Sequence, residues 1–248
     1  MRVFWASVIV VGLVAAMPVA ARAETAGEDK QIAAYVAADG KGPQSMALEP
    51  GALAAAGGRV KRAGPVLTFD LANGSEGIRL EDRTDCKAVM KASDCQQFFL
   101  VAALPSRHCY IVAKGHYEGT AYLLIDDRTG KGSAFPGPPR FAAKGNAILV
   151  LNNNELADGP AIEIWTRDAE GGTVLEWLHP IDGDEVAKVD RRASFDTVPQ
   201  AIELTHWAGD RIDLVLRYPA INDRKPVRVK ARISRVKGAW QFAVLAPT

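Results

Sequence analysis

The sequence predicts an all-β protein built from antiparallel meanders, with a short N-terminal helix after a signal peptide. Turn signals such as Asn73-Gly74 separate short apolar segments about every 10 residues over positions 65–248. Several segments alternate apolar and polar residues, as AIEIWTRD at 161–168 does, and this period of two indicates strands rather than helices. We therefore expect an incomplete or small β-propeller, with a β-sandwich as the alternative.

The first 23 residues have the pattern of a secretory signal peptide. Arg2 precedes the apolar run VFWASVIVVGLVAAMPVA, and Ala21, Arg22 and Ala23 form a small-x-small cleavage pattern. Pro18 and Arg22 interrupt a run that is already short for a membrane span. We predict a signal peptide at 1–23, a periplasmic or secreted protein, and no membrane span after cleavage.

The segment 24–64 is predicted to be helical or flexible and to precede a β-rich domain at 65–248. Three apolar residues recur at helical spacing before a stop at Asp39-Gly40: Ile32, Tyr35 and Val36. Pro50 then splits the Ala-rich stretch that follows. Because proline removes a backbone donor, we expect residues 41–64 to be mobile or loosely packed.

The charge balance argues against nucleic acid as a partner. The formal net charge is +1, and removal of Arg2 and Arg22 with the signal peptide leaves the chain nearly neutral. The densest basic run, at 224–237, alternates Lys and Arg with Val, Ala and Ile. This pattern favours a strand with one solvated basic face over a surface that binds polyanions.

Three cysteines lie in the predicted mature chain, where an oxidising compartment permits a disulfide. Cys86 and Cys95 flank a polar loop, whereas Cys109 begins the apolar segment CYIVA. We predict a disulfide between Cys86 and Cys95 and a buried Cys109, although connectivity cannot be derived from spacing alone. The cysteine and histidine spacings lack the pairs typical of a zinc site, so no metal or cofactor is expected.

The segments AYLLIDDRTGK, PPRFAAKGNAILVLNN and AIEIWTRDAEG resemble the propeller-like β blades of exported bacterial proteins. In those blades a DxxTG turn precedes a PxxSxDGxxLAV strand pair and an xIxIW strand. The resemblance covers residues 116–180, and Gly145 alone matches the SPDG turn, which aligns with positions 142–145. Such proteins are uncharacterised, so the resemblance implies a fold and not a reaction.

Acidic pairs and histidines are the candidate catalytic groups. Asp126-Asp127 and the DGDE sequence at 182–185 could bind Ca²⁺ or share a proton, but DGDE lacks the ligand order of an EF-type loop, and we expect both groups to be solvated turns. A hydrolase would require His116, Asp126 and Asp127 to converge in one pocket. We treat that enzyme as an alternative hypothesis.

The most distinctive polar cluster is Asn152, Asn153, Asn154 and Glu155, directly after the apolar strand AILVL. We expect this loop, with Trp165, to contact a ligand if it is more than a structural turn. The leading hypothesis is an exported, non-enzymatic protein that binds an unknown protein or small molecule through the loops of a β scaffold. A second alternative is an envelope scaffold or assembly protein, marked by an exposed apolar patch or an unpaired sheet edge.

Overall fold

The structure is a computed structural model of the whole chain. It describes residues 19–39, 42–75, 77–83, 95–116, 119–153, 159–181, 198–219 and 226–245. Within these ranges the protein is mostly β, with four small antiparallel sheets and two helices near the N-terminus. The predicted meanders are confirmed, and the described residues form no closed sheet or propeller.

Each sheet is a simple meander. Sheet A contains β1 (Val60–Ala63), β2 (Val66–Phe69) and β3 (Ile78–Glu81). Sheet B contains β4 (Gln96–Leu104), β5 (Cys109–His116), β6 (Gly119–Asp126) and β7 (Gly132–Phe135). Sheet C contains β8 (Pro139–Phe141), β9 (Ala147–Asn152), β10 (Ala161–Arg167) and β11 (Thr173–Pro180). Sheet D contains β12 (Ala201–Ala208), β13 (Arg211–Tyr218), β14 (Val227–Val236) and β15 (Ala239–Val244).

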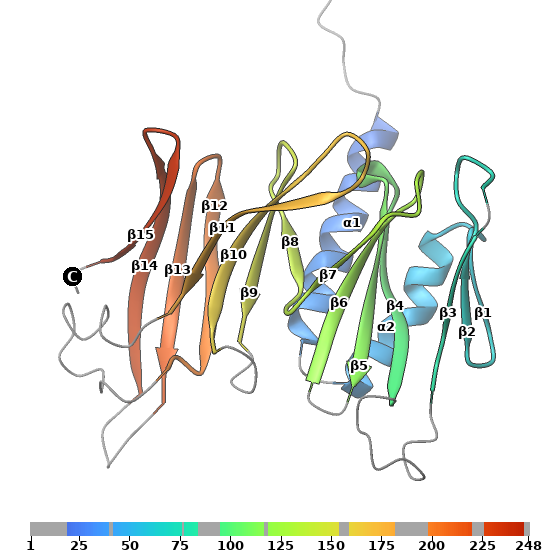
Figure 1. The fold of residues 1–248 in the computed structure, drawn as a ribbon, viewed down its shortest axis with the longest axis horizontal. Helices are drawn as coiled ribbons and strands as arrows, with labels where there is room; N and C mark the ends of the chain where they lie inside the picture. Colours follow the sequence, from blue (N-terminus) through green and yellow to red (C-terminus); the bar gives the residue numbers. More distant parts are fainter. Residues whose placement is uncertain are drawn as a thin grey trace, which may run out of the picture.

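The four sheets stand in a row in the order of the chain, with sheet A at one end and sheet D at the other (Figure 1). An apolar layer fills each junction between neighbouring sheets. Since sheets A and D lie at opposite ends of the row, the described sheets do not close into the ring that a propeller requires.

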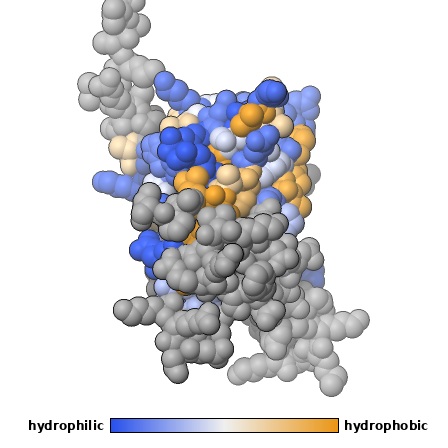
Figure 2. Space-filling view, turned by 90° about the vertical axis from the view of Figure 1, so that its left-hand side faces the viewer, coloured by the Kyte–Doolittle hydropathy of each residue, from blue (hydrophilic) through white to orange (hydrophobic). Residues whose placement is uncertain are grey.

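The position of a sheet in the row explains which residues of its strands are buried. In β4 the seven residues from Phe98 to Leu104 are all buried, because sheet B packs against a sheet on each face. In β14 the buried residues Val229, Ala231 and Ile233 alternate with more exposed polar ones. The predicted solvated basic face of this run is therefore confirmed, and Figure 2 shows many hydrophilic residues at the sheet D end of the molecule.

The N-terminal part is more ordered than the sequence suggested. The predicted helix is present as α1 (Val19–Ala37), which runs through the predicted cleavage point after Ala23. The expectation of loose packing at 41–64 is wrong, because α2 (Gly42–Ala55) and β1 occupy it. Pro50 lies inside α2, and both Ala52 of this helix and Ala56, which directly follows it, are buried in the junction of sheets A and B. Burial of these small residues offsets the stability that the helix loses because proline cannot donate a backbone hydrogen bond.

Both helices bond to the edge strand of sheet B. The Gln31 side chain accepts the N–H of Ala103 at 3.0 Å and donates to its carbonyl at 3.1 Å. Glu49 on α2 accepts the N–H of Leu100 at 3.0 Å. These contacts satisfy backbone groups of β4 that have no neighbouring strand on that side. No described helix is both long and apolar enough to span a bilayer.

Candidate functional site

The predicted asparagine cluster lies only partly within the described residues. Asn152 ends β9 and is buried, and Asn153 follows it. The Asn153 Oδ1 accepts the N–H of Ile202 at 2.7 Å, which links sheet C to the first strand of sheet D. Asn154 and Glu155 lie outside the described residues.

Trp165 lies away from the asparagines, in the junction between sheets B and C. It pairs with Ile148, whereas Asn152 pairs with Ala161 at the other end of β10. Its ring meets Phe135 edge to face, with centroids 5.3 Å apart, and its Nε1 donates to the Glu163 carboxylate at 2.7 Å. The structure therefore does not bring Trp165 and Asn152 together.

An open groove of about 770 Å³ lies beside Asn153. Its walls come from α1, β8 and β12, and β12 is the edge strand of sheet D. Most of the lining is apolar, and its apolar residues are Ile32, Ala33, Val36, Ala37, Phe141, Ala201, Ile202 and Leu204. The polar residues of the lining are Asp29, Asp39, Arg140, Asn153, Glu203 and Thr205. The groove thus combines an apolar wall with one edge of a β-sheet.

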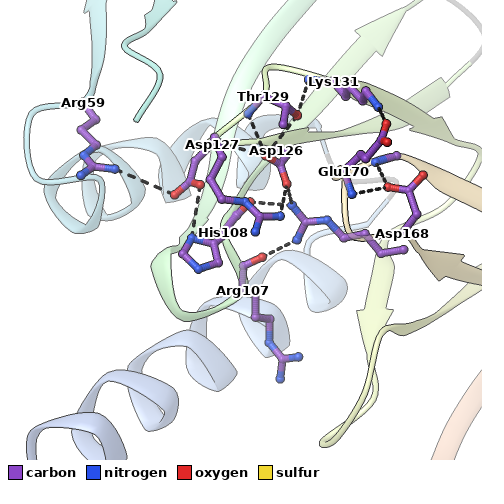
Figure 3. Close-up of polar contacts among 12 residues, drawn as sticks. Arg59, Arg107, His108, Asp126, Asp127, Thr129, Lys131, Asp168 and Glu170 are labelled. Atoms are coloured by element: carbon purple, nitrogen blue, oxygen red, sulfur yellow. Dashed lines mark hydrogen bonds and ion pairs between the residues drawn. The ribbon is translucent and has the colours of Figure 1, made fainter. Parts of the chain in front are cut away.

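A second concentration of polar groups surrounds Asp126 at the end of β6 (Figure 3). Its carboxylate is fully buried and accepts the N–H groups of Arg128 and Thr129, each at 2.9 Å. The Arg128 guanidinium donates to the same carboxylate at 3.0 Å, and Arg167 of β10 makes a further ion pair. The expectation that Asp126 and Asp127 form a solvated turn is wrong, since both are buried.

Arg167 joins three segments that are far apart in the sequence. Besides its ion pair with Asp126 of sheet B, it donates to the carbonyls of Arg107 and His108. Arg107 ends the short helix η2 (Pro105–Arg107), and His108 directly follows it. Gly171, in the β10–β11 turn, also approaches the carboxylate so closely that an added Cβ would lie 2.3 Å from Asp126 Cγ. A side chain at Gly171 would therefore displace the carboxylate.

The environment of Asp126 keeps it ionised. Burial opposes ionisation, but hydrogen bonds from the Arg128 side chain and from the backbone of Thr129 and Arg128, together with the charge of Arg167, outweigh that effect. The pKa of Asp126 consequently lies well below its usual range. A carboxylate held in this way is suited to fixing arginine side chains, and poorly suited to accepting a proton at neutral pH.

The proposed hydrolase trio is not assembled. Asp126 is paired with Cys109 in the β5–β6 ladder, whereas His116 is paired with Gly119 at the other end. The histidine near the acidic pair is His108, whose Nδ1 lies 3.4 Å from Asp127 Oδ1. Arg59 approaches the same carboxylate at 4.0 Å. The sequence alone did not indicate His108, because its closeness to Asp127 depends on how the turn after η2 lies against the end of β6.

Among the described residues, no group of three or more His, Cys, Asp or Glu side chains could hold a metal ion. The DGDE sequence at 182–185 and Cys86 lie outside the described residues. Cys109 is a buried free thiol, as predicted. The Cys86–Cys95 disulfide stays a prediction.

A cavity of about 350 Å³ opens beside the Asp126 cluster. Arg107, Arg128 and Arg167 line it, with His108 and Phe141. Sequence reasoning missed these arginines, because they come from three separate turns and strand ends. The one available signal was the position of Asp126-Asp127 directly before Arg128 in a turn.

Comparisons with models of protein families, with curated proteins and with solved structures found no match.

Proposed function

We propose that this is an exported, non-enzymatic binding protein whose groove between α1, β8 and β12 holds an extended apolar segment of a partner polypeptide. The observation that carries the proposal is the meeting of an apolar wall and a sheet edge in one open groove. A peptide in β conformation can add to an exposed sheet edge through its backbone and place alternate side chains against an apolar wall.

Groups beside the groove support the binding of a peptide along the β12 edge. The Asn153 Oδ1 accepts the Ile202 N–H at 2.7 Å. This side-chain oxygen takes the place that a carbonyl of a bound peptide would take at the β12 edge. Ala33 and Val36 lie on the α1 face that lines the groove, and Ala33 is exposed. The volume falls within the range of roughly 300–1,000 Å³ that is typical of ligand pockets.

Binding is tested with a random peptide library displayed on phage, selected on the wild-type protein. Ala33→Trp fills the groove from an exposed helix position, and Ala54→Trp adds the same side chain on the exposed face of α2. Selected peptides are expected to alternate apolar and polar residues and to lose about tenfold or more in affinity for A33W. Equal affinity for wild type, A33W and A54W would refute the groove as the binding site.

The export proposal rests on the N-terminal signal pattern. Expression of the full chain in a bacterial host and intact-mass measurement of the periplasmic fraction should show a mature protein beginning at Glu24. Retention of the full-length chain in the cytoplasm would argue against export.

One observation favours the envelope-assembly alternative. β11 is one of the two edge strands of sheet C, and its Val174, Leu175 and Leu178 are 60%, 41% and 50% exposed. Exposed apolar residues on an unpaired edge are typical of surfaces that associate. If β11 mediates assembly, Leu178→Lys should reduce the mass of any oligomer measured by light scattering, and an unchanged oligomer would exclude this edge.

A further inference from the structure

Three arginine side chains line the cavity beside Asp126. Arg107, Arg128 and Arg167 line it, and each has a buried Nε with no hydrogen-bond partner. A buried donor without an acceptor destabilises the folded protein. The three guanidinium groups that line this one cavity are therefore not fully paired within the described residues.

The remaining contacts of these arginines hold them in place. Arg167 is anchored by the carbonyls of Arg107 and His108 and by Asp126. Arg128 donates to Asp126 at 3.0 Å, and Arg107 donates to the Ala142 carbonyl at 3.2 Å. The guanidinium groups are therefore fixed before any ligand arrives, which reduces the entropy lost on binding.

Four carboxylates lie close to these arginines and limit the positive charge, and one of them is the buried Asp127, which acts on Arg128. Asp126 pairs with Arg128 and Arg167, Glu28 lies 4.0 Å from the Arg107 Nε, and Asp168 lines the cavity. Asp168 accepts the N–H groups of Glu170 and Gly172 at 2.9 and 2.8 Å. The positive charge of the arginines is thus nearly balanced, which fits a small ligand more than a large polyanion.

The cavity wall also contains a residue in an uncommon backbone conformation. His108 closes η2 with φ of 51°, in the left-handed region that non-glycine residues rarely adopt. Its carbonyl accepts Arg167 at 2.6 Å, and its ring lies beside Asp127. These bonds hold the turn that places Arg107 next to the cavity, where the Arg107 guanidinium lies 5.1 Å from the centre of the Phe141 ring.

We propose that this cavity binds a small oxyanion, either free or as the charged end of a small ligand, through Arg107, Arg128 and Arg167. Planar guanidinium groups match the oxygen spacing of carboxylate and phosphate. Phe141 supplies an apolar wall for the rest of the ligand. This site is separate in chemistry from the peptide groove, so either proposal can fail without the other.

Isothermal titration calorimetry of the full-length protein with inorganic phosphate and with succinate, at constant ionic strength, tests the proposal and distinguishes phosphate from carboxylate. Arg128→Gln changes a half-exposed side chain and should weaken binding by about tenfold or more. Arg107→Gln should act in the same direction. Arg211→Gln, whose ion pair lies with Asp213 in sheet D, is the matched control and should bind as the wild type does.

Saturable binding of one anion, lost in R128Q and R107Q but kept in R211Q, supports the site. Absence of saturable binding of both phosphate and succinate to the wild type overturns the proposal. Equal affinity of wild type, R128Q and R107Q also overturns it, because the anion would then bind elsewhere. Far-UV circular dichroism of each variant shows that the fold is retained.

Discussion

Arg167 of sheet C forms an ion pair with Asp126 of sheet B, and this pair fixes the junction of the two sheets at the end where β6 finishes. The Asp126 side chain is completely buried and that of Arg167 is 11% exposed. The pair is therefore well shielded from solvent. Removal of one partner would leave the other charge buried and uncompensated.

Asp126→Asn should lower the free energy of unfolding by about 3–5 kcal/mol. The substitution keeps the size of the side chain but removes the charge that Arg128 and Arg167 require. Urea denaturation followed by tryptophan fluorescence measures the change. Asp70→Asn breaks the exposed pair with Lys61 and should have little effect; equal losses in the two variants would contradict the assigned role of Asp126.

The same pair predicts acid sensitivity. The folded-state pKa of Asp126 is lowered below the unfolded value of about 3.9. Its contribution to stability is therefore fully present above that unfolded pKa and is lost as the pH falls towards the lower folded pKa. Wild type should lose stability more steeply than D126N below about pH 4, as measured by thermal unfolding over a pH series. Parallel pH profiles would show that Asp126 is not the responsible group.

Gln31→Ala should expose the edge of sheet B. Loss of both bonds to Ala103 leaves a buried N–H and carbonyl unpaired, which should destabilise the protein by about 1–3 kcal/mol. Hydrogen exchange of the Ala103 amide should accelerate more than that of amides in sheet D. Lys30→Ala changes an exposed neighbour on α1 and serves as the control. Unchanged exchange at Ala103 would mean that another group protects this edge.

Glu163→Gln should stabilise the protein at neutral pH. Burial raises the pKa of Glu163, although the hydrogen bond from Trp165 partly opposes the rise. Ionisation above that raised pKa is therefore unfavourable in the folded state, and the penalty disappears below the unfolded pKa. Glutamine keeps an oxygen that accepts Trp165 Nε1. The gain in melting temperature should be present at pH 7 and shrink in acid; a gain independent of pH would exclude this cause.

Cys109 should be unreactive in the folded protein. Burial raises the pKa of its thiol to about 12, because the thiolate would be desolvated. If Cys86 and Cys95 form the predicted disulfide, mass spectrometry after iodoacetamide should find a single alkylated site, Cys109, in unreduced protein, and only after unfolding. Alkylation of Cys86 or Cys95 without reduction would contradict the pairing.

Strands and turns were predictable because their signals are local. The hairpin around Asn73-Gly74 appears as β2 and β3, and the three strands after the cysteine loop appear as β4, β5 and β6. The helix α2 was missed, because proline disfavours a helix locally, whereas burial of Ala52 and Ala56 against sheets A and B favours it through contacts distant in sequence. Local propensity is weaker than such packing.

The β character, the meander order and the solvated basic face of β14 could all be predicted from the chain, since each depends on the period of its apolar residues. Packing of the sheets against one another places them in an open row, buries Asp126, and brings Arg107, Arg128 and Arg167 to one cavity with Phe141. These contacts join residues on separate turns and strands. Their proximity depends on how whole sheets pack and is not encoded in any short segment.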